Sequence, residues 1–147
     1  MSVSLLDVNV LVALTDPMHR HHESAHRWFG RNRIVGWATC PHTINGCVRI
    51  MSNPVYSLIH QSPSAVATLL RATSDTKDHQ FWPDSVSLLD DTLFHVAKLR
   101  GHQKITDAYL LGLAVWNHGR LVTFDRSIPV DAVQGASNRN LVVIPHI

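Results

Sequence analysis

The sequence predicts an α/β fold, a three-layer α/β/α sandwich with a central, mostly parallel sheet. Short apolar runs alternate with longer segments in which apolar residues recur every three or four positions, as in helices that cover a sheet. Each short run is continuously apolar, which is typical of strands buried on both faces. No repeat and no linker rich in Gly, Ser or Pro divides the 147 residues, so we expect a single domain over 1–147.

In the first half of the chain, continuously apolar runs typical of strands alternate with segments that have the apolar spacing of helices. Asp16-Pro17 and Gly30 are expected to end helical segments, and Pro41 occupies the first helical position, where proline is favoured. In order, we expect a strand over 3–6, a helical turn over 8–14, an amphipathic helix over 19–29, a strand over 34–39 and a helix from Pro41 to Asn53.

The second half continues the alternation. Thr106 is a plausible N-cap for a helix that is apolar nearly all round, which Gly119 would terminate. The stretch 129–140 is predicted to be the most mobile loop. In order, we expect a helix opened by Ser62-Pro63, a strand over 80–82, a helix capped by Asp91 that runs to Arg100, a helix over 107–117, and strands over 121–124 and 141–144.

Composition limits the class of protein. The formal charge of +2 is too small for the field of the whole molecule to attract nucleic acid, so any RNA contact must be local. Cys40 and Cys47 form no CxxC pair, which favours free, buried thiols in a reducing compartment over a redox role. We find no signal peptide and no apolar stretch near the roughly 18 residues of a membrane span, so we expect a cytoplasmic protein without a membrane partner.

Three aspartates from distant parts of the sequence are candidates for one site. Asp7 and Asp125 each end a predicted strand, and Asp107 lies in the first turn of the apolar helix before the last of these strands. Ligands of parallel sheets bind beyond the carboxyl ends of the strands, where such residues can meet. Carboxylates crowded there repel one another unless a divalent cation such as Mg²⁺ or Mn²⁺ lies between them. Each could instead be an ordinary turn residue or a first-turn helix acid.

Such a site has a definite chemistry. A hard cation with oxygen ligands and retained water can generate hydroxide, hold a phosphate and stabilise the leaving oxygen. The sequence therefore predicts hydrolysis of a phosphodiester in RNA or DNA.

The segments that carry these residues also resemble a known family, the VapC branch of the PIN-domain ribonucleases. The resemblance extends over nearly the whole chain, in the family's order. It rests on LLDVNVLVAL (5–14), TCPHTINGCVRI (39–50), FWPD (81–84), ITDAYLL (105–111) and LVTFD (121–125).

The resemblance implies a PIN-like fold and a set of roles. Asp7 and Asp107 would be the principal metal ligands, Asp125 would complete the acidic cluster directly or through water, and Asn9 would orient Asp7. It also implies the toxin of a type II toxin–antitoxin system, a Mg²⁺-dependent endoribonuclease that cuts structured RNA such as transfer or ribosomal RNA. Such toxins are usually homodimers and are silenced by a cognate VapB-type antitoxin.

One position departs from the family pattern. Family members carry a glutamate between the threonine and the asparagine of the second motif, where this chain has Ile44. At an effective dielectric of about 20, two unit charges about 4 Å apart interact by roughly 4 kcal/mol, so losing the carboxylate weakens metal binding by several kcal/mol at most. One metal ion could still bind, and a second becomes doubtful. We hypothesise a strongly reduced rate or an inactive variant.

Other residues invite weaker interpretations. His19, His22 and His26 share a helical face that could hold zinc, but a solvated surface is the simpler interpretation. His102 and Lys104 could bring positive charge to RNA phosphate or belong to an ordinary exposed loop. Arg49 and Arg126, close to the predicted rim, are better candidates for phosphate contact. Four aromatic side chains are expected in the core or at a dimer surface, namely Trp28, Phe29, Trp37 and Trp116.

Two classes of function therefore remain, and a third class fits the sequence poorly. The chain is either a metal-dependent endoribonuclease or a catalytically inactive PIN domain that binds antitoxin or RNA. A phosphoryl-accepting receiver domain also uses a strand-end aspartate. Its acidic pair at the first strand and its lysine after the last strand are not evident here.

Overall fold

A computed structural model of the chain describes residues 2–56 and 61–145 and contains a five-stranded sheet of order β3-β2-β1-β4-β5. All four neighbouring pairs in this sheet are parallel. The central strand β1 places Leu5 opposite Ala38 of β2 on one side and Leu121 of β4 on the other. The strands are β1 (Ser4–Leu6), β2 (Trp37–Thr39), β3 (His79–Phe81), β4 (Arg120–Thr123) and β5 (Leu141–Val143).

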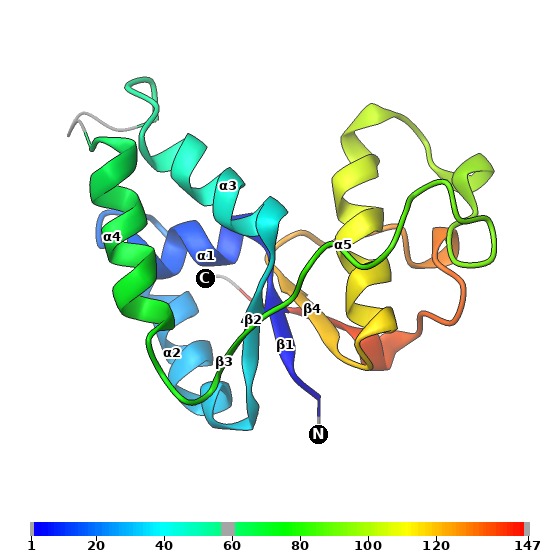
Figure 1. Ribbon diagram of the computed structural model, residues 1–147, viewed down its shortest axis with the longest axis horizontal. Coiled ribbons are helices and arrows are strands. Elements are labelled where there is room, and N and C mark those ends of the chain that lie inside the picture. The colour runs from blue at the N-terminus through cyan, green and yellow to red at the C-terminus, as the bar shows by residue number, and fades with distance from the viewer. Residues whose placement is uncertain (1, 57–60, 146–147) are drawn as a thin grey trace.

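Helices cover both faces of the sheet, as Figure 1 shows. Leu6 packs in the core on the side of the first four helices, whereas Leu5 packs on the side of the fifth, because successive side chains of a strand point to opposite faces. The predicted α/β/α sandwich is therefore confirmed. The helices are α1 (Val8–Thr15), α2 (His22–Asn32), α3 (Pro41–Met51), α4 (Pro63–Ser74) and α5 (Ile105–Trp116).

The end of α1 is held by two histidines of α2. The ring of His22 donates to the carbonyl of Ala13 at 2.7 Å, and the ring of His26 donates to that of Leu14 at 3.0 Å. Both carbonyls lie in the last turn of α1, where they have no partner within the helix. The two histidines therefore have a structural role beyond facing solvent.

Helix α2 runs past the glycine that was predicted to close it. Gly30 lies inside the helix, on its exposed side, and the chain continues through a 3-10 turn, η1 (Arg33–Val35), to Gly36 at φ 118°. The strand predicted over 34–39 is accordingly shorter at its start. Of the four aromatic residues expected in the core or at a dimer surface, Phe29 and Trp37 are buried, Trp28 is half-buried and Trp116 is 56% exposed.

The helix predicted from Asp91 to Arg100 is wrong. The Asp90 carboxylate accepts hydrogen bonds from the backbone and the hydroxyl of Thr92, which fixes a turn instead of a helix start. Phe94 then forms an antiparallel bridge with Val133, and a 3-10 turn, η2 (Val96–Lys98), follows. Val133 belongs to the loop predicted to be most mobile, so the bridge connects this loop to Phe94. The loop contains η4 (Val130–Ala132) and η5 (Asn138–Asn140), and its residues Ala132 and Val133 are buried.

Helix α5 begins and ends earlier than predicted. A 3-10 turn, η3 (His102–Lys104), leads into it, so Lys104 occupies the N-cap position expected for Thr106. The helix stops at Trp116, and His118 adopts the left-handed conformation with φ 56°. Gly119 then donates its N–H to the carbonyl of Ala114. Among the described residues, no helix is long and apolar enough to cross a membrane.

Two helical glycines differ in the space around them, which provides a test of the packing. A Cβ at Gly112 of α5 would collide with the buried ring of Phe94, whereas a Cβ at Gly30 of α2 would meet nothing within 4 Å. We expect Gly112→Ala to lower the free energy of unfolding by about 1–3 kcal/mol through overpacking. Gly30→Ala should raise it by about 0.5–1 kcal/mol through helix propensity. Chemical denaturation measures both, and equal effects would contradict this packing.

Candidate active site

The sheet topology selects one edge as the place for a ligand. From the central strand β1 the chain moves outward through β2 to β3, and it later returns on the other side of β1 as β4. Strands β1 and β4 are neighbours at this reversal, and ligands of open parallel sheets bind beyond the carboxyl ends of such strands. Asp7 directly follows β1 and Asp125 lies two residues beyond β4.

Asp7 is fixed by both oxygens of its carboxylate. It is the N-cap of α1, where Oδ1 accepts the backbone N–H of Val8 at 2.7 Å. Oδ2 accepts the hydroxyl of Thr123 at 2.7 Å. The residue is 6% exposed, so this carboxylate is held in one orientation at the bottom of the site.

Thr123, the last residue of β4, links the other groups. Besides donating to Asp7, its fully buried hydroxyl oxygen accepts the side-chain N–H of Asn9 at 3.2 Å and the backbone N–H of Asp125 at 3.0 Å. A hydroxyl has one donor and two acceptor positions, and all are used. Among the described contacts, Asn9 therefore reaches Asp7 through Thr123, and its own oxygen accepts the backbone N–H of Phe124.

The three predicted aspartates share one electrostatic environment. The pKa of Asp7 is raised to about 6, mainly by burial and in part by the charges of Asp107 and Asp125, while the hydrogen bonds from Thr123 and Val8 act in the opposite direction. Burial also raises the pKa of Asp107, with the charge of Asp125 as the second cause. Residues 7, 107 and 125 of this sequence thus come within electrostatic reach of one another.

Asp125 differs from the other two because hydrogen bonds hold its charged form. Its Oδ1 accepts the hydroxyl of Ser127 at 2.7 Å and the backbone N–H of Ser127 at 2.8 Å, and these bonds lower its pKa. Lys104 donates to the same hydroxyl oxygen of Ser127 at 2.6 Å. The sequence pattern did not indicate Thr123 or Ser127, since hydroxyl residues at strand ends are common in every class of protein.

The donor set suits a hard divalent cation but does not form a closed cage. Within residues 2–56 and 61–145, no three His, Cys, Asp or Glu side chains lie close enough together to hold one ion. Magnesium commonly binds through one or two carboxylates and keeps several waters, which needs no such cage. The ionised form of a buried carboxylate with two like charges nearby is stabilised by a cation, so the chemistry of Asp7 and Asp107 suits a divalent cation that retains water.

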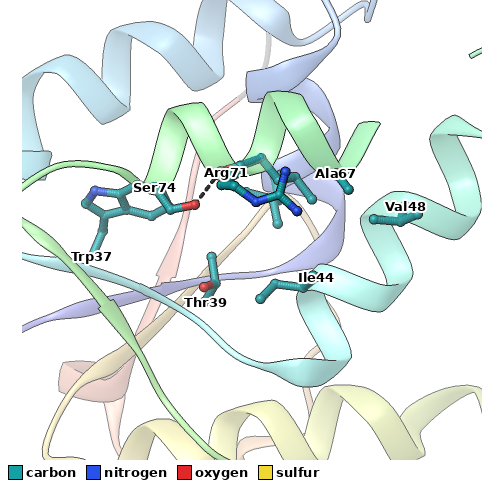
Figure 2. Close-up of a pocket in the computed structure, with 9 residues that line it drawn as sticks. Trp37, Thr39, Ile44, Val48, Ala67, Arg71 and Ser74 are labelled. Carbon is teal, nitrogen blue, oxygen red and sulfur yellow. Dashed lines mark hydrogen bonds between the residues drawn. The ribbon is translucent and has the colours of Figure 1, made fainter. Parts of the chain in front are cut away.

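Ile44 has mainly apolar neighbours in the structure. It lies in the first turns of α3, is half-buried, and lines a hollow of about 240 Å³ between α3 and α4. Figure 2 shows its side chain directed toward Thr39 of β2. The hollow is mainly apolar with Arg71 on its wall, so the isoleucine is suited to its neighbours; its remaining lining residues are Leu11, Trp37, Val48, Ala67, Leu70 and Ser74.

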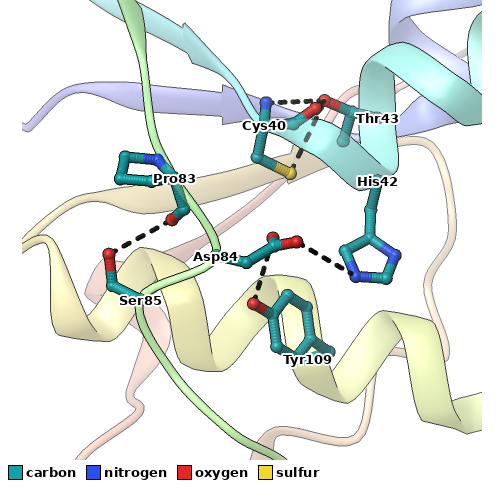
Figure 3. A network of polar contacts seen from close by, with 7 residues as sticks. All are labelled: Cys40, His42, Thr43, Pro83, Asp84, Ser85 and Tyr109. Carbon is teal, nitrogen blue, oxygen red and sulfur yellow. Dashed lines mark hydrogen bonds and ion pairs between the residues drawn. The ribbon is translucent and has the colours of Figure 1, made fainter.

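A second polar network lies where α3 and α5 face each other, and Figure 3 shows it. Asp84, three residues beyond β3, accepts the hydroxyl of Tyr109 at 3.1 Å, and its other oxygen lies 3.9 Å from Nε2 of His42. Burial raises the pKa of Tyr109, with the charge of Asp84 adding to it, so the phenol stays a donor. Arg49 and Asn45 line a hollow of about 180 Å³ with His42 and Asp84. The sequence indicated Arg49 but not Asp84 as a site residue.

The burial of Asp7 has a consequence for stability. Its pKa of about 6 in the fold exceeds the value near 4 in an unfolded chain, so the metal-free fold loses stability as pH rises from about 4 to 6. The loss is on the order of 3 kcal/mol at neutral pH. We expect Asp7→Asn to raise the melting temperature of the metal-free protein by a few degrees at pH 7.5 and to flatten this pH dependence.

Thermal unfolding in a chelator, from pH 4 to 8, measures the effect. Exposed Asp131→Asn is the matched control, for which we expect no change. An Asp7→Asn protein less stable than wild type at every pH would show that the carboxylate stabilises the fold.

Comparison with known proteins identifies the family of the chain. A family model described as the PIN domain matches residues 4–132. Ribonuclease VapC44 of Mycobacterium tuberculosis (strain ATCC 25618 / H37Rv) is 45% identical over 141 residues, which cover 96% of this chain and 99% of the relative. Ribonuclease VapC39 of the same strain is 41% identical over 132 residues, covering 90% and 95%. Ribonuclease VapC38 is 42% identical over 131 residues, covering 86% and 87%. The match over residues 4–132 and the identity to these relatives over most of their lengths show that the chain belongs to the PIN-domain family.

Proposed function

We propose that this chain is a metal-dependent endoribonuclease, the toxin of a type II toxin–antitoxin pair. The observation that carries the proposal is the buried Asp7 carboxylate, which shares its environment with Asp107 and Asp125 at the carboxyl ends of β1 and β4. The similarity to three ribonucleases over most of their lengths supports RNA as the substrate. We further propose Mg²⁺, or Mn²⁺ in its place, as the cofactor.

Each site residue has a defined task in this proposal. Asp7 and Asp107 would hold the ion, while Asp125 would bind one of its waters. A bound divalent ion supplies a hydroxide nucleophile at neutral pH and offsets charge on the phosphate. Thr123 keeps Asp7 in a single orientation, and Asn9 supports Thr123. The residues thus position the ion's ligands before RNA arrives.

Partners and substrates follow from the same similarity. We propose a cognate VapB-type antitoxin that silences the enzyme, a structured substrate such as transfer or ribosomal RNA, and a homodimer as the working form. The protein would act in the cytoplasm, where these RNAs are present.

Ile44 supports a second candidate function. The chain has an isoleucine where the family pattern has a glutamate, and this side chain lines an apolar hollow instead of contributing negative charge. A site with three carboxylates binds a divalent ion less tightly than one with four. The alternative is therefore a PIN domain that binds antitoxin or RNA and no longer cleaves.

RNA cleavage with and without Mg²⁺ separates the two functions. We expect the wild-type protein to cut unfractionated transfer or ribosomal RNA only when the ion is present. Asp7→Asn should reduce the rate by at least a hundredfold, since it removes a ligand charge. Gel analysis of end-labelled RNA measures the rate. If wild type and Asp7→Asn are equally silent while both bind RNA, the binding function is the correct one.

Restoring the glutamate tests the role of position 44. We expect Ile44→Glu to raise the Mg²⁺-dependent rate by about tenfold, because an added carboxylate near the ion strengthens its binding. Val48→Glu is the matched control, since it places the same charge in the same hollow one turn further along α3. If a folded Ile44→Glu protein cleaves no faster than wild type, Ile44 does not limit the site.

A further inference from the structure

We propose that Lys104 serves as the second cation of the site, joined to Asp125 through Ser127 and contacting a phosphate oxygen of bound RNA. This inference rests on the proposed ribonuclease function. In this proposal, the side chain of Lys104 takes the place of a second divalent ion.

The side chain of Lys104 is part of a connected network. Its Nζ donates to the hydroxyl oxygen of Ser127 at 2.6 Å, and that hydroxyl donates to Oδ1 of Asp125 at 2.7 Å. The backbone N–H of Ser127 donates to the same oxygen at 2.8 Å. Lys104 itself is half-buried at the last residue of η3, directly before α5. The ammonium group is therefore held at the acidic cluster by a short chain of hydrogen bonds.

The charge of Lys104 acts on two of the three aspartates. It lowers the pKa of Asp107, against the larger effect of burial, and it lowers the pKa of Asp125 in addition to the hydrogen bonds from Ser127. Both effects require the ammonium to lie within Coulombic range of both carboxylates. Lys104 directly precedes the helix that carries Asp107, and its ammonium group reaches the loop that carries Asp125 through Ser127.

The charge balance favours one metal ion. Asp7, Asp107 and Asp125 together with Lys104 have a formal charge of −2 when all are ionised, which a single divalent ion balances. A second such ion would leave the site with an excess positive charge, and Ile44 supplies none of the negative charge that would offset it. A site of this composition is suited to one metal ion and one ammonium group.

Lys104 retains the capacity to bind phosphate. An ammonium group has three N–H donors, and in the described part of the chain its hydrogen bond to Ser127 uses one. The remaining donors can meet a non-bridging phosphate oxygen, for which lysine is a common partner. Arg49 lines the hollow beside His42 and Asp84 and has no described hydrogen bond to this network.

Replacing the lysine should change metal binding and cleavage in opposite directions. We expect Lys104→Met to bind Mn²⁺ several-fold to tenfold more tightly, since a like charge is removed from the ion's surroundings. The same variant should cleave transfer RNA on the order of a hundredfold more slowly, because charge on the phosphate is less stabilised. Lys104→Arg keeps the charge and should recover part of the rate without the gain in Mn²⁺ affinity.

Calorimetry or the spin-resonance signal of free Mn²⁺ measures the affinity, and gel assays measure the rate. Lys98→Met, an exposed lysine on η2, is the matched control and should change neither quantity. Melting temperatures of all variants exclude unfolding as the cause. A Lys104→Met protein that cleaves as fast as wild type, or binds Mn²⁺ no more tightly, overturns the proposal.

The two proposals fail in different ways. If wild type cleaves no RNA under any metal condition, the ribonuclease function fails, and Lys104 is then judged by binding alone. Tighter Mn²⁺ binding together with at least threefold weaker binding of transfer RNA by Lys104→Met would support its role. If Lys104→Met binds Mn²⁺ or transfer RNA as wild type does, the proposed role of Lys104 is overturned.

Discussion

The hydroxyl of Thr123 donates a hydrogen bond to the buried carboxylate of Asp7, and the rest of the site depends on this contact. It joins the end of β4 to the end of β1, two strands that are neighbours only because of the sheet order. The same oxygen accepts N–H groups from Asn9 and Asp125, so one side chain fixes the relative positions of three others. A fully satisfied buried hydroxyl is rigid because moving it would leave several partners without hydrogen bonds.

This arrangement buries an acid, Asp7, whose ionised form destabilises the metal-free fold. Burial and two neighbouring carboxylates raise the pKa of Asp7, so the metal-free protein is strained electrostatically at neutral pH. A bound cation attracts all of these carboxylates and so offsets the repulsion between them. The same feature that weakens the empty fold therefore provides affinity for the ion, which is a common relation between stability and function at active sites. Lys104 offsets part of the repulsion from within the chain.

Local sequence signals failed where tertiary contacts or side-chain hydrogen bonds decided the structure. The segment 91–100 has helix-compatible residues, but Asp90 binds Thr92 in a turn, and Phe94 packs against Gly112 of α5. Gly30 has no packing partner and does not stop α2, because a glycine ends a helix only when the chain needs a left-handed residue there. Pro41 was interpreted correctly, since its preference for the first helical position is a property of its own ring.

The sequence by itself determined the alternation of strands and helices, the strand-end positions of Asp7 and Asp125, and the departure at Ile44. The first two follow from periodicity and residue type, which are local quantities, and the third rests on the resemblance to the family. Only the tertiary structure decided that Thr123 connects the acids, that Ser127 and Lys104 adjoin Asp125, and that Ile44 lines an apolar hollow. Side-chain hydrogen bonds between residues about a hundred positions apart depend on strand order and register, and no short stretch of sequence encodes either.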